Sequence, residues 1–236
     1  MIHGFDNREG KIWFNGKLVE WNDSKIHVLN HGLHYASSVF EGERAYKGKI
    51  FKSEEHTQRF FEGAQTMDME IPFTKSEIMK AKNELIISNG LKEAYVRPIA
   101  WRGSEMMAVS AQKTTINVAI ATWEWPSYFD PSEKMKGIKL DIAKWKRPDP
   151  NCAPVHVKAS GLYMICTLSK HDAEAKGYSD ALMLDWRDLI AEATGANIFF
   201  KFKDGNLYTP KPDCFLDGIT RRTVLQLAKD LGVNTI

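Results

Sequence analysis

The chain of 236 residues has few cysteines, and none of them forms a pattern that staples a small fold or binds zinc. The three thiols, Cys152, Cys166 and Cys214, are odd in number and widely spaced, and no Cys-x-x-Cys pair occurs. A disulfide framework and a metal centre are therefore not expected, and the thiols fit a reducing compartment.

Long apolar runs and a strong excess of one charge are also missing. No stretch approaches the roughly 20 apolar residues of a transmembrane helix, and residues 1–6 lack a basic-then-apolar signal. The 32 Lys and Arg against 30 Asp and Glu leave a net charge of +2, too small for a field that attracts nucleic acid or anionic lipid. We predict a cytoplasmic protein without nucleic-acid or membrane partners, and a solvated strand and loop for the basic cluster at 134–147.

What is present is an ordinary globular composition with one break. The hydrophobic content is 43%, and this length can bury a substantial core in one large or two modest domains. The polar segment at 125–136 contains two prolines and interrupts the periodic pattern, so we place an interdomain loop there. It separates a predicted small N-terminal α/β domain, 1–124, from a larger C-terminal domain, 137–236.

Turn and capping signals define elements in both predicted domains. The Asn15-Gly16 pair predicts a tight hairpin within 12–21, and Thr74 with Glu77 forms a capping box for a helix that ends at Gly90. Further helices are predicted at 54–67, 160–176 and 218–231, and strands at 39–46, 50–51, 95–101, 115–123, 138–145, 181–185 and 197–202.

Three positions suit chemistry on a carbonyl cofactor. Lys158 lies between the apolar Val157 and small residues, which fits the partial burial that lowers the pKa of a nucleophilic lysine. The predicted helix at Gly218 begins with free backbone N–H groups that can bind an anion, and Glu192 lies among small residues rather than charged ones. Each feature alone is also typical of an exposed lysine, a plain helix cap and a surface carboxylate.

Seven short motifs follow one another over the whole chain, and together they are specific. They are residues 31–44, the H-x-x-R of 56–59, the Y-x-R-P of 95–98, the W-x-x-Y of 125–128, the lysine segment 146–163, the E-x-x-x-x-N-I-F of 192–199, and the G-I-T-R of 218–221. In this order they resemble the signatures of branched-chain amino-acid aminotransferases. The resemblance implies an α/β (α+β), two-domain fold of the D-amino-acid-transaminase type, fold type IV of pyridoxal-phosphate enzymes.

The resemblance also implies roles around pyridoxal 5′-phosphate. Lys158 would form the internal aldimine and move the proton between Cα and C4′, while Glu192 would pair with the pyridine nitrogen. The remaining cofactor-binding residues that it implies are Arg59, Ile219 and Thr220 at the phosphate, Tyr163 at the 3′ oxygen, and Asn197 within the Glu192 signature.

A substrate pocket with aromatic walls and one arginine is implied as well. Aromatic rings offer apolar surface to an aliphatic side chain, and hydroxyl edges with an arginine accept a carboxylate. Tyr95 would orient the α-carboxylate, and Arg97 would receive the second carboxylate of glutamate. The other residues of this implied pocket are Tyr35, Phe40, Trp125, Tyr128 and Tyr163.

The predicted activity is transamination of leucine, isoleucine and valine with 2-oxoglutarate and glutamate, by a homodimer or dimer-based oligomer. D-amino-acid transaminase and aminodeoxychorismate lyase share the fold, but residues 40–42 and 95–97 favour the branched-chain type. One departure is that the family continues beyond the helix at Gly218 with a small-residue loop near the phosphate, whereas this sequence ends at Ile236. The large domain is therefore expected to be incomplete, and a catalytically impaired remnant is a further alternative.

Overall fold

The computed structural model describes residues 4–125 and 135–236, which fold into two compact units of mixed α/β structure. Unit 1 is Met1–Tyr128 together with Lys158–Gly161, and unit 2 is Phe129–Val157 with Leu162–Ile236. The short segment that carries Lys158 therefore belongs with the N-terminal unit. The predicted interdomain loop falls largely on 126–134, outside the described residues, so the predicted domain limits stay a prediction.

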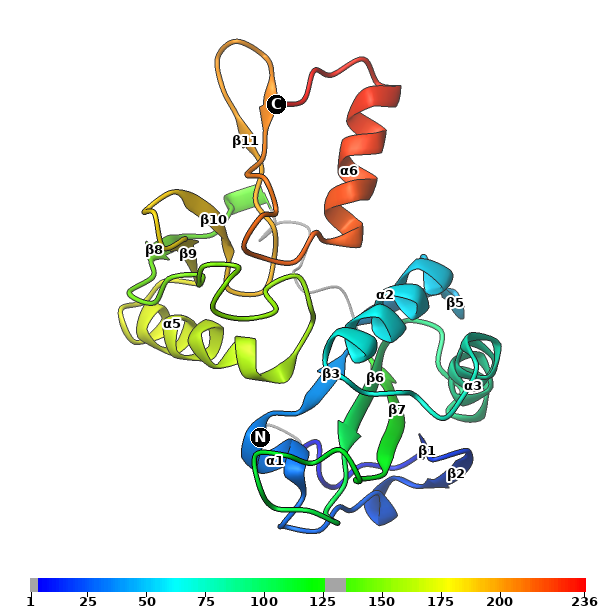
Figure 1. Cartoon of the computed structure of the whole chain (residues 1–236). Coiled ribbons are helices and arrows are strands. Elements are labelled where there is room, and N and C mark those ends of the chain that lie inside the picture. The colour runs from blue at the N-terminus through cyan, green and yellow to red at the C-terminus, as the bar shows by residue number, and fades with distance from the viewer. Residues whose placement is uncertain (1–3, 126–134) are drawn as a thin grey trace. The chain divides into compact units, whose positions relative to one another are not determined.

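Unit 1 is built on an antiparallel sheet with the strand order β2-β1-β7-β6-β4-β5, and β3 pairs with β6 beside β4 (Figure 1). The predicted hairpin forms at Asn15 and Gly16, whose φ angles of 47° and 90° are those of a tight primed turn. The strands are β1 (Lys11–Phe14), β2 (Lys17–Glu20), β3 (Ser38–Phe40), β4 (Glu43–Tyr46), β5 (Lys49–Ile50), β6 (Ala94–Arg102) and β7 (Ile116–Glu124).

Alternation along β6 divides the side chains between two faces of this sheet. Val96 and Ala100 are fully buried in the core with side chains of the helices, whereas Tyr95, Arg97 and Ile99 lie half-buried on the other face. The predicted capping box is confirmed at the start of α3. The helices of unit 1 are α1 (His31–Tyr35), α2 (Ser53–Thr66) and α3 (Lys75–Ser88), with a 3₁₀ turn η1 (Trp21–Asp23).

An ion pair lies fully buried between α3 and β4. Lys82 Nζ is 2.9 Å from both carboxylate oxygens of Glu43 and donates to Thr57 Oγ1 at 2.8 Å. Burial lowers the pKa of Lys82 and raises that of Glu43, and the attraction between the two charges opposes both shifts. The pair is thus tolerated in the core because each charge supplies the partner of the other.

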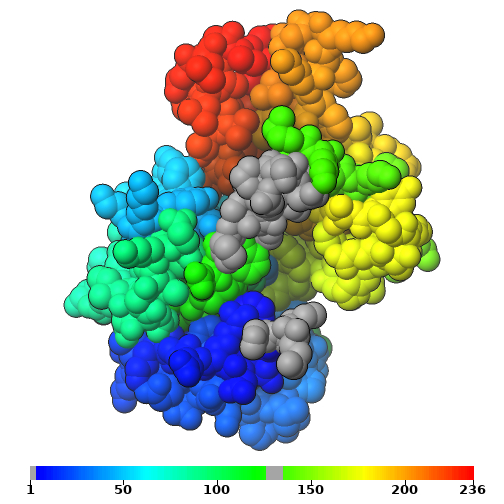
Figure 2. Space-filling view, turned by 180° about the vertical axis from the view of Figure 1, so that it is seen from behind, coloured from blue at the N-terminus to red at the C-terminus, as the bar shows by residue number. Residues whose placement is uncertain are grey.

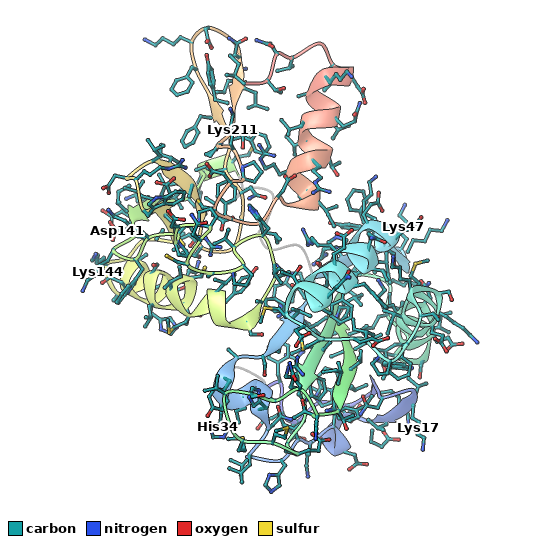
Figure 3. All side chains as sticks on the ribbon, in the orientation of Figure 1. Lys17, His34, Lys47, Asp141, Lys144 and Lys211 are labelled. Atoms are coloured by element: carbon teal, nitrogen blue, oxygen red, sulfur yellow. The ribbon has the colours of Figure 1, made fainter. Side chains whose placement is uncertain are left out.

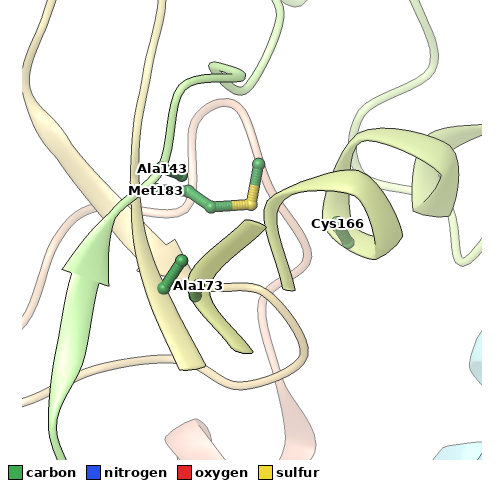
Figure 4. Close-up of a cluster of buried hydrophobic side chains, with 5 residues drawn as sticks. Ala143, Cys166, Ala173 and Met183 are labelled. Carbon is green, nitrogen blue, oxygen red and sulfur yellow. The ribbon is translucent and has the colours of Figure 1, made fainter. Parts of the chain in front are cut away.

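Unit 2 contains a three-stranded sheet, β10-β9-β8, whose parallel strands β8 and β9 are connected through α5. A small cluster of Ala143, Cys166, Ala173 and Met183 fills the space between α5 and the sheet (Figure 4), and Tyr163 packs partly buried against it. The elements are β8 (Leu140–Ile142), the 3₁₀ turn η2 (Ser160–Tyr163), α5 (Met164–Ala175), β9 (Asp180–Leu184), β10 (Ile190–Ala193), β11 (Phe200–Lys201), β12 (Leu207–Tyr208) and α6 (Ile219–Asp230).

The last residues of the chain return to the hairpin of β11 and β12. Leu207 N donates to Asn234 O at 2.9 Å, and Ile236 N donates to Leu207 O at 3.0 Å. Helix α6 consequently lies beside this hairpin, as the red and orange surfaces of Figure 2 show. Among residues 4–125 and 135–236, no helix is long and apolar enough to cross a membrane.

Two sequence predictions for unit 2 were wrong in detail. The strand predicted at 197–202 is reduced to Phe200–Lys201, because the Asn197 side chain is used in contacts described below, whereas β10 was not predicted at all. The predicted solvated cluster is correct for exposed lysines such as Lys144 (Figure 3) but wrong for Arg147, which is only 4% exposed.

Candidate active site

Lys158 is held in unit 1 by backbone pairing with β3. Phe40 N donates to Lys158 O at 3.1 Å, and Val39 forms an antiparallel bridge with Ala159. Ser38 Oγ donates to Ser160 Oγ at 2.7 Å on the same edge. The lysine segment therefore acts as an added strand, and the position of Lys158 along β3 is fixed by main-chain geometry.

The Phe40 ring lies between an amine and a guanidinium. Lys158 Nζ is 5.0 Å from the ring centroid, and Arg97 Cζ is 4.6 Å from it. Lys158 itself is half-buried. Three of the residues predicted for the site, which lie far apart in the sequence, are thus brought together within unit 1.

Tyr95 extends this cluster on the face of the sheet that carries Arg97. Arg97 Nη2 donates to the Tyr95 hydroxyl at 3.1 Å, while Arg97 Nε is buried without a hydrogen-bond partner among the described residues. The Tyr95 ring stacks on Trp123 at 4.8 Å and contacts Trp125 at 5.5 Å. Gly42 is required beside it, because a Cβ there would collide with the Tyr95 hydroxyl.

Two predicted pocket residues are not placed in this cluster. Tyr35 is 46% exposed at the end of α1, and its ring stacks on His31 at 4.5 Å. In the described part of the chain it makes no ring contact or hydrogen bond with Phe40, Tyr95 or Arg97. Tyr128 lies outside the described residues.

Arg59 on α2 is bound to a buried carboxylate. Its Nε and Nη2 donate to the two oxygens of Glu41 at 2.6 and 2.9 Å, and His56 Nδ1 lies 2.7 Å from Glu41 Oε2. Burial raises the pKa of Glu41, but the hydrogen bonds and charges of His56 and Arg59 outweigh it and lower that pKa to about 2. Arg59 Nη1 is buried and has no partner among the described residues, so it is a donor available to an anion.

In unit 2, Asn197 connects Glu192 to the start of α6. Its Nδ2 donates to Glu192 Oε2 at 3.2 Å, and its Oδ1 accepts from Gly218 N at 3.2 Å. Glu192 lies on β10, 9% exposed, with Arg147 Nε 3.6 Å from Oε1. A buried carboxylate with these partners can remain charged and hold a proton on a nearby basic nitrogen.

The N-terminus of α6 is suited to a phosphate. Gly218 is its N-cap without a side-chain cap, so the backbone N–H groups of buried Ile219 and exposed Thr220 remain for an anion. A Cβ at Gly218 would collide with Asn197 Oδ1, so this approach needs glycine. The donors of unit 2 and the available donor of Arg59 in unit 1 each have the chemistry that the phosphate and ring of pyridoxal 5′-phosphate require.

A separate group of potential metal ligands in unit 2 consists of Asp185, Asp213 and Cys214. Arg187 already binds both carboxylates, with Nη2 2.6 Å from Asp185 and 2.8 Å from Asp213. Burial raises the pKa of Cys214 to about 12, which keeps its thiol protonated. This group is better explained as an ion-pair network than as a metal centre.

Sequence reasoning assigned no role to three residues that the structure places in direct contact with the predicted site. Glu41 and His56 bind Arg59 or its partner, and Arg147 lies against Glu192. All three stand within the motif segments, and Glu41 follows the apolar Val39 and Phe40. A charged residue directly after buried apolar residues was the signal that could have identified it.

Comparisons with known proteins agree with the motif order. Residues 38–236 match the family Amino-transferase class IV. A protein of Rickettsia felis named probable branched-chain-amino-acid aminotransferase is 45% identical over 222 residues, which cover 94% of this chain and 75% of that protein.

Solved structures of a branched-chain amino acid aminotransferase designated T.th. have the same fold. The complex with N-(5′-phosphopyridoxyl)-L-glutamate has a TM-score of 0.91 and the complex with 4-methylvaleric acid 0.90; both are 38% identical and cover 97% of this chain and 76% of the other. The family and fold predicted from the sequence are confirmed. The chain belongs to the class IV aminotransferases.

Proposed function

We propose that the protein is a pyridoxal-phosphate-dependent transaminase of branched-chain L-amino acids, with 2-oxoglutarate and glutamate as the second pair. The observation that carries the proposal is the Phe40 ring flanked by the Lys158 amine and the Arg97 guanidinium. A proton-transferring amine, an apolar wall and a carboxylate receptor are what this reaction requires. The glutamate adduct and the 4-methylvaleric acid bound by the T.th. enzyme support both substrate classes.

The residues divide the work between holding the cofactor and moving a proton. Bound pyridoxal phosphate supplies an aldehyde for the substrate amine and a ring that draws electrons from Cα. Arg59 Nη1 and the N–H groups of Ile219 and Thr220 bind the phosphate. Glu192 holds the proton on the ring nitrogen.

Lys158 takes the proton from the substrate Cα and returns it to the cofactor carbon as the general base and acid. Its main-chain link to Phe40 keeps the amine at a fixed height beside the wall on which the substrate side chain packs. Tyr163 completes the proposed set as the donor to the 3′ oxygen of the ring.

Dual specificity follows from the mixed character of the Phe40–Tyr95–Arg97 cluster. A leucine side chain can pack on the Phe40 ring without displacing a charge, because Arg97 is already held by the Tyr95 hydroxyl and the two aromatic faces. A glutamate side chain can instead accept from the buried, unpartnered Nε of Arg97. Trp125, Tyr35 and Tyr128 are proposed to complete the pocket.

Replacing Arg97 by alanine is expected to separate the two substrate classes. KM for glutamate and 2-oxoglutarate should rise by roughly 10- to 100-fold, the equivalent of a charged hydrogen bond worth about 1.5–3 kcal/mol. KM for leucine should change much less, because its side chain brings no charge to that position. Steady-state kinetics with both substrates on one preparation measures the difference, and an equal rise for all substrates would show that Arg97 is structural.

We also propose that the active form is a homodimer, with a cytoplasmic location that fits its three free thiols and that cell fractionation tests. Large apolar side chains are exposed beside α1: Ile26, Val28, Leu29 and Leu33 are 47–67% exposed. A mainly apolar hollow of about 380 Å³ adjoins them, lined by Leu33, Phe14, Trp101 and Arg97 among others. Contiguous exposed apolar surface of this kind is typical of protein interfaces.

The dimer proposal predicts that Leu33→Glu weakens association at least about tenfold, as expected for a central interface residue. Sedimentation equilibrium measures the dissociation constant. Ile87→Glu is the matched control, since Ile87 is 77% exposed on α3, away from this surface. A wild-type monomer at micromolar concentration, or equal effects of both variants, would contradict the proposed surface.

The function itself is tested with purified protein supplied with pyridoxal 5′-phosphate. We expect a yellow protein that forms glutamate from L-leucine and 2-oxoglutarate. Turnover of D-alanine without turnover of L-leucine would favour the D-amino-acid transaminase alternative. Absence of both activities, with cofactor bound, would contradict the proposed reaction.

A further inference from the structure

We propose that Glu41 is a positioning residue that orients Arg59 so that its Nη1 edge is presented to the cofactor phosphate. The proposal deepens the proposed function and rests on the phosphate role of Arg59 given there. It assigns a function to a buried carboxylate that touches neither substrate nor cofactor in that scheme.

The geometry of the Glu41–Arg59 pair determines which donors remain. Both carboxylate oxygens are occupied by the Nε and Nη2 donors of Arg59, a two-point contact that fixes the plane of the guanidinium. Nη1 is the nitrogen left without an acceptor, and it is buried. In the described residues, Glu41 is the acceptor for the Arg59 side chain, so its removal frees the guanidinium to rotate.

Glu41 is itself fixed from two sides. The side chain is 1% exposed, His56 Nδ1 lies 2.7 Å from Oε2, and Glu41 N donates to Pro98 O at 2.8 Å. His56 and Arg59 lie one turn apart on α2, so one helix face supplies both partners of the carboxylate. The orientation of Arg59 is therefore built into the contact between α2 and the strand segment that follows β3.

The Glu41 charge also opposes a phosphate, and the structure indicates which effect is larger. Its charge faces Arg59 and His56 on α2, with the Glu43–Lys82 pair nearby, and the first two lower its pKa far enough to keep it ionised near neutrality. Both cationic partners contact it directly, so most of its field is compensated locally. The loss of a fixed donor geometry then outweighs the relief of repulsion.

The test compares binding of pyridoxal 5′-phosphate with binding of pyridoxal, which lacks the phosphate, to the apoprotein of the whole chain. Glu41→Gln is expected to weaken pyridoxal 5′-phosphate about tenfold, the order expected when an immobilised side chain regains its freedom, and to leave pyridoxal unchanged. The measured quantity is the ratio of the two dissociation constants, from absorbance titration. A loss of stability alone would not move this ratio.

Glu43→Gln is the matched control, because Glu43 is an equally buried glutamate two positions away that binds Lys82 rather than Arg59. It should lower the thermal midpoint but keep the wild-type ratio. If Glu41→Gln does not fold, His56→Leu, which removes one fixing contact from Glu41, should shift the ratio a few-fold in the same direction.

Arg59→Gln separates the two layers of the argument. If Arg59→Gln does not reduce the preference for the phosphorylated cofactor, the phosphate role of Arg59 fails. If Arg59→Gln reduces it but Glu41→Gln and His56→Leu do not, or if they increase it, the positioning role of Glu41 is overturned. If all hold, Glu41→Gln added to Arg59→Gln should have no further effect, since the residue acts through Arg59.

Discussion

Lys158→Ala is expected to lower kcat for leucine and 2-oxoglutarate on the order of 10³-fold or more, the range of a positioned proton-transfer group. Lys158 Nζ is the amine beside the Phe40 ring, and it is the one that main-chain pairing with β3 holds there. Alanine keeps the backbone bond to Phe40, so the fold and the phosphate contacts should survive. The variant should therefore bind pyridoxal 5′-phosphate noncovalently while turnover is lost.

Covalent labelling checks the same assignment independently of activity. Sodium borohydride added to the wild-type holoenzyme should fix the cofactor to the peptide that contains Lys158, as peptide mass spectrometry would detect. Lys47→Ala is the control, because Lys47 is exposed in the turn between β4 and β5, and it should behave as wild type (Figure 3). Label on a different lysine would exclude Lys158 as the reacting amine.

Glu192→Gln is expected to reduce kcat on the order of 10²-fold, the cost of removing a main electrostatic stabiliser. Glutamine keeps the length of the side chain and can still accept from Asn197, but it has no charge to hold a proton on the cofactor ring. The nearby Arg147 makes the loss larger, since its charge 3.6 Å away is then uncompensated. KM should change less than kcat, because the residue does not touch the substrate.

The matching control is Glu174→Gln on α5, where an exposed glutamate forms an i,i+4 pair with Lys170. Its kinetic constants should equal those of the wild type. The thermal midpoint and cofactor content of Glu192→Gln must also be measured, so that misfolding is not mistaken for chemistry. Near-normal kcat in a folded, cofactor-loaded Glu192→Gln would rule out this carboxylate as the ring partner.

The sequence by itself determined the elements whose signals are local. The Asn15-Gly16 turn, the Thr74 capping box and the helix that begins after Gly218 all form where the pattern predicts them. Such features depend on the conformational preferences of a few adjacent residues, so a short window contains their cause. The motif order also identified the family, because it samples the whole chain.

Only the tertiary structure decided which of these residues meet. Lys158 joins Phe40 across 118 positions (158 − 40) through main-chain bonds, and the same backbone bonds would form with almost any residue types. The partner of Arg59 proved to be Glu41, and Asn197, which reads as a turn residue, proved to connect Glu192 with Gly218. These contacts depend on how strands and helices pack over long sequence separations, and local composition carries no record of that packing.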